Sequence, residues 1–92
     1  DPGNPAYLDS LGWAQYKLAM YEPSEKNLRA AARHARGDPT IREHLGDLYA
    51  ATGREEQAIR EWNHALSRLP ENPKRLRIKI REALSTLDAA RR

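Results

Sequence analysis

The sequence predicts an all-α fold, an α-solenoid of five helices in which two helical hairpins are followed by a capping helix. Three Asx-Pro pairs lie 34 residues apart, at Asn4-Pro5, Asp38-Pro39 and Asn72-Pro73. A Leu-Gly pair recurs at the same spacing, at Leu11-Gly12 and Leu45-Gly46. A fixed period of this length indicates a repeat in which each unit is one helix pair.

Each Asx-Pro pair predicts the start of a helix. The Asn or Asp side chain can accept a hydrogen bond from a first-turn N–H that has no partner inside the helix. Proline loses no bond at the first helical position, because its missing N–H would have been unpaired there. We therefore expect helices to begin at Pro5, Pro39 and Pro73.

Each of the first two intervals also holds a second helix. In the first, the residues MYEPSE at 20–25 mark a new start, because proline is tolerated in a first helical turn. In the second, Gly53 marks a break and Glu55 and Glu56 an acidic restart. The predicted helices cover residues 5–19, 22–36, 39–52, 55–69 and 73–90, and residues 1–4 are a linker or the start of a fragment.

The composition favours one small globular domain. The chain has 92 residues, of which 39% are hydrophobic and 32% charged, and no apolar run is long enough for a membrane span. Without cysteine there is no disulfide, thiolate zinc site or cysteine nucleophile, and the redox compartment stays open. Because there is no initiator Met and no signal-peptide pattern, we expect a segment of a longer chain.

The net charge of +3 is unevenly distributed. Residues 73–92 hold seven Lys or Arg and two Asp or Glu, a net charge of +5, whereas residues 1–72 carry −2. The basic character therefore belongs to the last predicted helix.

These spacings resemble the tetratricopeptide repeat, a 34-residue helix pair with the pattern W-x2-L-G-x2-Y, then A-x3-F, then P. The second interval matches it at Leu45, Gly46, Tyr49, Ala58, Trp62, Ala65 and Pro70. The first interval matches at Leu11, Gly12 and Ala31. The resemblance implies a degenerate first unit at 5–38, a second unit at 39–72 and a basic amphipathic capping helix at 73–92.

The glycines predict close helix crossings. Glycine inside a helix costs about 1 kcal/mol relative to alanine, so Gly12 and Gly46 indicate places where a Cβ would not fit. Apolar residues at helical spacing then predict the core. In the second unit these are Leu45, Leu48, Tyr49, Ile59, Trp62, Ala65, Leu66 and Leu69, and in the first Tyr7, Leu8, Leu11, Ala14, Leu18, Tyr21, Leu28, Ala31, Ala32 and Ala35.

The last helix has the pattern of a solenoid cap, with one apolar stripe and a polar outer face. The stripe consists of Leu76, Ile80, Ala83, Leu84 and Leu87. Ile78 falls opposite it, and Lys79-Ile80 stands where Leu-Gly is due.

Catalytic chemistry is weakly represented, and we expect no enzyme, no cofactor and no metal. His34, His44 and His64 lack the spacing of metal ligands, the glycines form no phosphate loop, and the serines have no nucleophile-elbow context. Tetratricopeptide proteins are protein-interaction modules whose first helices line a groove for a partner peptide. The resemblance therefore implies a protein partner bound at Asp9, Trp13, Tyr16, Lys17, Glu43, Asp47, Ala50, Lys74, Arg77 and Arg81.

Three expectations concern individual residues of this groove. Trp13 lies off the apolar stripe, so it either shields a neighbouring helix or is an exposed aromatic anchor beside Tyr16, and we predict the anchor. Ile78 should also be accessible. Glu43 and Asp47 lie one turn apart on the third predicted helix, and Arg77 and Arg81 lie one turn apart on the fifth. We predict that these four charges face one another across the groove.

One subclass of the family grips the C-terminal carboxylate of chaperones with Lys and Asn side chains. Its five positions hold Asp9, Trp13, His44, Lys74 and Ile78 here, and only Lys74 fits. We therefore expect no carboxylate-clamp binding of chaperones.

The segments LDSLGWAQYKL and EHLGDLYAATGR are also similar to the C-terminal repeats of large bacterial tetratricopeptide proteins, many of which are envelope lipoproteins that scaffold other proteins. A bacterial scaffold is the leading interpretation, in the cytoplasm or, for an envelope protein, in the periplasm. Nucleic-acid binding through the basic last helix is a disfavoured alternative, and a purely structural solenoid end is another.

Overall fold

The computed structural model describes residues 2–92, which fold into five α-helices and no strand. The helices are α1 (Pro5–Lys17), α2 (Tyr21–His34), α3 (Pro39–Ala51), α4 (Glu55–Leu66) and α5 (Pro73–Ala90). The predicted all-α fold with five helices is confirmed. α3 runs unbroken through Gly46.

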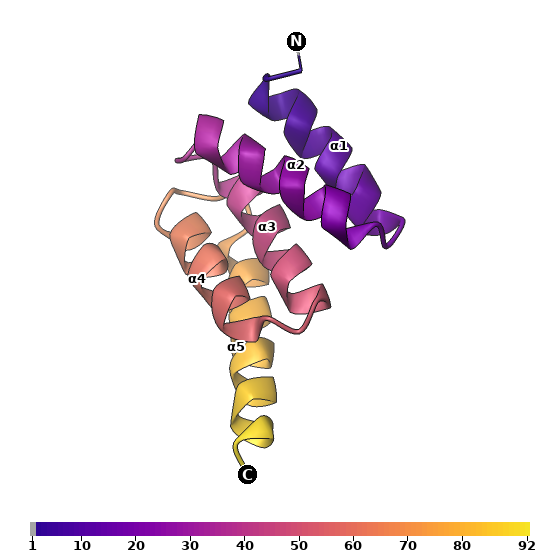
Figure 1. Cartoon of the computed structure of the whole chain (residues 1–92). Helices are drawn as coiled ribbons and strands as arrows, with labels where there is room; N and C mark the ends of the chain where they lie inside the picture. The colour runs from indigo at the N-terminus through magenta and orange to yellow at the C-terminus, as the bar shows by residue number, and fades with distance from the viewer. Residues whose placement is uncertain (1) are drawn as a thin grey trace.

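The helices form two hairpins and a final helix. α1 packs against α2, α3 packs against α4, and α2 joins the pairs by lying against α3. α5 packs along α4 and continues beyond it, so the two ends of the chain lie at opposite ends of an elongated molecule of 47 × 28 × 18 Å (Figure 1).

The three predicted caps are present. Asn4 accepts hydrogen bonds from the backbone N–H groups of Ala6 and Tyr7 at 2.8 and 3.1 Å. Asp38 caps α3 in the same way, and Asn72 accepts from the N–H of Arg75 at 3.0 Å. These caps explain why the predicted starts of α1, α3 and α5 are correct.

The helix ends were predicted less well. α1 ends at Lys17, α2 at His34 and α4 at Leu66, each two or three residues before the predicted end. Ala19 and Leu69 follow α1 and α4 with φ values of 60° and 54°. The residue that adopts this left-handed conformation after a helix is usually glycine, and neither Ala19 nor Leu69 is a glycine.

Both repeat glycines lie at close helix crossings, as predicted. A Cβ on Gly46 would lie 2.5 Å from Trp62 Nε1, and a Cβ on Gly12 would lie 2.8 Å from Leu28 Cγ. In the first hairpin a further bond holds the crossing, since the buried Ser24 hydroxyl donates to the Gly12 carbonyl at 2.7 Å.

The core lies between the hairpins and under α5. Its buried apolar residues are Leu8, Leu28, Ala31, Ala32, Ile41, Leu45, Leu48, Tyr49, Ala58, Trp62, Ala65, Leu76 and Ala83. Ile59, Leu66, Tyr21, Ala35 and Ile80 are partly buried and pack against it.

Six residues predicted for the apolar stripes are instead exposed: Tyr7, Leu11, Ala14, Leu18, Leu69 and Leu84. The first four form one stripe on α1. In α3 the corresponding residues Ile41, Leu45 and Leu48 are buried, because α3 is packed between α2 and α4. No helix within residues 2–92 covers the same side of α1.

Candidate interaction surface

α1, α3 and α5, the helices that follow the three Asx-Pro pairs, are joined side by side by two clusters of contacts. We call the surface that they form the first-helix surface. Every residue that the sequence placed at the groove lies on one of these three helices, although not all of them lie at the junctions.

The junction between α1 and α3 is a column of aromatic rings. The ring of Trp13 stacks on that of His44 with centroids 3.9 Å apart, and on that of Tyr16 with centroids 4.8 Å apart. His44 Nδ1 lies 2.8 Å from Asp9 Oδ1, and Lys17 Nζ lies 5.4 Å from the Trp13 ring centroid. The column holds the indole in a fixed position between two helices.

This geometry corrects the expectation that Trp13 is substantially exposed. Its indole is only partly accessible, because the rings of His44 and Tyr16 both stack on it. The predicted proximity of Tyr16 is confirmed. Ile78, with 48% of its surface exposed, is accessible as predicted.

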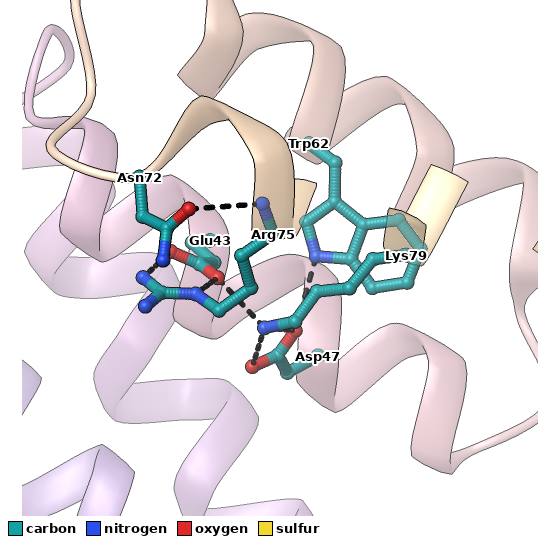
Figure 2. Close-up of polar contacts among 6 residues, drawn as sticks. All are labelled: Glu43, Asp47, Trp62, Asn72, Arg75 and Lys79. Atoms are coloured by element: carbon teal, nitrogen blue, oxygen red, sulfur yellow. Dashed lines mark hydrogen bonds and ion pairs between the residues drawn. The ribbon is translucent and has the colours of Figure 1, made fainter. Parts of the chain in front are cut away.

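The junction between α3 and α5 is a cluster of charges (Figure 2). Arg75 donates to both oxygens of Glu43 at 2.6 and 2.7 Å. Lys79 donates to Glu43 at 2.7 Å and to the two oxygens of Asp47 at 2.9 and 3.0 Å. Trp62 Nε1 donates to Asp47 at 3.1 Å, so the second hairpin is part of the same network.

The prediction that Glu43 and Asp47 face Arg77 and Arg81 is therefore wrong. It assumed that equivalent positions of successive helices meet. Each first helix instead touches the preceding one with one edge and the following one with another, so equivalent residues cannot face each other.

The two junctions follow one rule. Asp9 and Trp13 meet His44, just as Glu43 and Asp47 meet Lys79. The residues on the earlier helix are 34 apart, whereas His44 and Lys79 are 35 apart. The apolar stripe is displaced equally, since Leu76 and Ile80 follow Ile41 and Leu45 by 35 residues. At 3.6 residues per turn this displacement rotates the packed face of α5 by about 100° relative to its cap.

Sequence analysis missed Arg75 and Lys79 as groove residues and gave His44 no role beyond the clamp. The 35-residue offset of the apolar stripe is visible in the sequence. It could have placed Arg75 and Lys79 on the side of α5 that faces α3.

The charge cluster shifts the pKa values of its two carboxylates in opposite directions. Burial alone would raise the pKa of Glu43, but hydrogen bonds from Arg75 and Lys79 outweigh burial and lower the pKa to about 2. For Asp47, burial dominates and raises the pKa despite the contact with Lys79. Glu43 is thus the firmly ionised centre of the cluster.

The remaining predicted groove residues lie on a different edge. Lys74, Arg77 and Arg81 are exposed, and their side chains form no hydrogen bond or ion pair with any part of residues 2–92. Together with Ile78 they form what we call the outer edge of α5, which points away from α3. Ala50 is partly buried on α3.

The chemistry of the surface is that of recognition by charge and ring stacking. Across residues 2–92, no group of three or more His, Asp or Glu side chains is arranged to hold a metal ion. Over the same range, no helix has the length and apolar character that crossing a bilayer requires. In comparisons with protein-family models and with curated proteins, this chain matches none.

Proposed function

We propose that this chain is a non-enzymatic protein-interaction module of the tetratricopeptide type, a scaffold that binds a partner segment on the first-helix surface. Support for the family comes from the physical roles of the repeat residues. Gly12 and Gly46 lie where a Cβ would clash with the facing helix, and Ala58, Trp62 and Ala65 are buried. These are the roles that the spacing of the repeat requires.

The observation that carries the proposed binding site is the ring column of Tyr16, Trp13 and His44. An aromatic side chain that is already held in place loses little conformational entropy when a partner packs against it, which favours its use as an anchor. Lys17 beside the indole adds a cation at the rim. The site would therefore take a segment with an apolar side chain and a nearby acidic group.

A carboxylate clamp is incompatible with this geometry. Two of the positions where the clamp needs cations or amides are occupied by Asp9 and His44, which bond to each other. Chaperone tails are therefore not the proposed ligand.

The test is the effect of Trp13→Ala on partner capture. The protein that contains this chain is purified with an affinity tag, and co-purifying proteins are identified and then titrated in pure form. Trp13→Ala should weaken binding at least about tenfold. The control Leu69→Ala changes a residue that is 94% exposed and lies outside the surface, and should bind as the wild type does.

Circular dichroism of each variant shows whether it is folded. If folded Trp13→Ala binds the purified partner with wild-type affinity, the first-helix surface is not the binding site.

A second candidate function, nucleic-acid binding, gains from one observation. Arg77 and Arg81 are not neutralised by α3, so the outer edge of α5 presents three cations, with Lys74, that have no partner among residues 2–92. Contacts to phosphates make log K fall linearly with log salt, and each lost contact reduces that slope by about 1. A titration of single-stranded RNA with Arg77→Gln would show this reduction only if the edge binds phosphates.

A further inference from the structure

A crevice of about 280 Å³ lies where α2, α3 and α4 meet, and no residue of the ring column or the charge cluster lines it. Ala32 and Leu45 are apolar parts of its wall, and Tyr49 is a third. Four arginines also line it, Arg29, Arg33, Arg36 and Arg42, together with a single acid, Glu61. This excess of positive charge does not depend on the proposed function of the first-helix surface.

Two of the charges on the wall satisfy each other. Arg42 Nη1 donates to Glu61 at 3.0 Å, and Arg42 Nε donates to the backbone carbonyl of Arg36 at 3.2 Å. The remaining arginines have little to bind. Arg29 makes one long contact of 3.5 Å with Glu25, whose carboxylate is held by both terminal nitrogens of Arg54.

Arg33 and Arg36 make no side-chain hydrogen bond or ion pair anywhere in residues 2–92. A cation near a helix C-terminus is ordinary, because the helix dipole favours it. The hairpin itself does not require these cations, however. The positions 34 residues after Arg29, Arg33 and Arg36 in the second hairpin hold Asn63, Ser67 and Pro70.

A hydroxyl on the same wall is available to a ligand. Tyr49 as a whole is only 6% exposed, and its hydroxyl forms no hydrogen bond within residues 2–92. Every fully buried side-chain N or O atom of the described residues has a partner, so the Tyr49 hydroxyl remains accessible, and on the crevice wall it can donate to a ligand. Burial also raises the pKa of Tyr49, which keeps the phenol protonated and able to donate.

We propose that this crevice binds a phosphoryl group, with Arg33, Arg36 and Arg29 as the cationic wall and the Tyr49 hydroxyl as a neutral donor. Guanidinium groups pair with phosphate oxygens through two parallel N–H bonds, and arginine clusters are a common means of recognising phosphorylated side chains. Three guanidinium groups and a phenol match the three terminal oxygens of a phosphomonoester better than the two oxygens of a carboxylate.

The experiment titrates the ¹⁵N-labelled chain at constant ionic strength and follows the Nε–H signals of its arginines. The probes are inorganic phosphate, N-acetyl-O-phosphoserine amide and N-acetyl-glutamic acid amide. Saturable shifts at Arg33 and Arg36 with the two phosphates are expected. Tighter binding of the phosphoserine compound would indicate a phosphorylated side chain as the source, and equal binding would indicate the free ion.

Three variants define the site. The pair Arg33→Gln and Arg36→Gln should weaken phosphate binding at least about tenfold, and Tyr49→Phe about threefold to tenfold, because it removes only the hydroxyl. The matched control, Arg60→Gln with Arg91→Gln, removes the same charge from exposed residues that do not line the crevice, and should bind as the wild type does.

Three results would overturn the proposal. The first is the absence of saturable binding of either phosphate. The second is an equal loss in the Arg60→Gln and Arg91→Gln control, which would mean non-specific attraction. The third is binding of the glutamic acid compound as tight as that of the phosphoserine compound.

Discussion

Trp62 occupies the space that a side chain on Gly46 would need. A Cβ at position 46 would lie 2.5 Å from Nε1 of the indole, which is 4% exposed and cannot move aside. The same indole donates to Asp47, the residue after Gly46. The missing side chain thus lets an aromatic ring lie on the backbone of α3 and join the charge cluster.

We expect Gly46→Ala to destabilise the fold by about 1–2 kcal/mol. Overpacking costs ~1–3 kcal/mol, and alanine recovers up to ~1 kcal/mol of helix propensity. Gly46→Leu should cost more, and Trp62→Ala about 3–5 kcal/mol. Urea unfolding measures each value. Gly37→Ala is the control, because its Cβ would meet nothing closer than 3.7 Å, and a similar loss there would refute the steric explanation.

Lys79→Met should destabilise the fold by about 1–3 kcal/mol. Lys79 is partly buried between Glu43 and Asp47, so the loss lies between those for exposed and buried ion pairs. Arg81→Met removes the same charge from the same helix but leaves no carboxylate unpaired, and should change stability by no more than about 0.5 kcal/mol. Equal effects of the two substitutions on the urea midpoint would contradict the assigned partners.

Stability should fall in acid because of Glu43. Its pKa is about 2 in the folded protein against an ordinary value of 4.5, so its contribution is complete above 4.5 and is lost as the pH falls towards 2. A shift of this size corresponds to about 3 kcal/mol. The raised pKa of Asp47 acts in the opposite direction and reduces the net loss.

Glu43→Gln should flatten this dependence, which urea unfolding at about pH 7 and about pH 3 would show. A wild-type slope in that variant would place the acid sensitivity in other carboxylates.

The rings of Trp13 and His44 should be energetically coupled. A double-mutant cycle of Trp13→Leu and His44→Leu should give a coupling free energy of about 0.5–1.5 kcal/mol, as for stacked aromatic pairs. Repeating the cycle with Asp9→Asn separates stacking from the Asp9–His44 contact. A coupling that vanishes in that background would mean that the Asp9–His44 contact, and not the ring contact, joins α1 to α3.

The helix starts were predictable because the information is local. Asn4, Asp38 and Asn72 satisfy backbone groups within a few residues of themselves, whatever the rest of the fold does. The ends of α1 and α4 were not predictable, because the residues that follow them in the left-handed conformation, Ala19 and Leu69, are not glycines.

The candidate site was only partly predictable for a related reason. Periodicity identifies which residues share a face, but not which neighbour that face meets. Tyr7 and Leu18 have the spacing of core residues, yet no helix of residues 2–92 covers them. The partners of Glu43 depended on the one-residue displacement of the packed face of α5. The caps give no sign of this displacement, because they keep the 34-residue spacing.

The rotation of α5 also makes the two ends of the row of α1, α3 and α5 chemically different, one apolar and the other basic. One end presents the uncharged stripe of Tyr7, Leu11 and Leu18, and the other presents Arg77 and Arg81. If copies stacked end to end, these guanidinium groups would be desolvated against a surface whose nearby carboxylate, Asp9, is already bonded to His44. A head-to-tail contact that does not close would propagate into fibres. The displaced register of α5 thus attaches a desolvation penalty to a head-to-tail contact between copies of this chain.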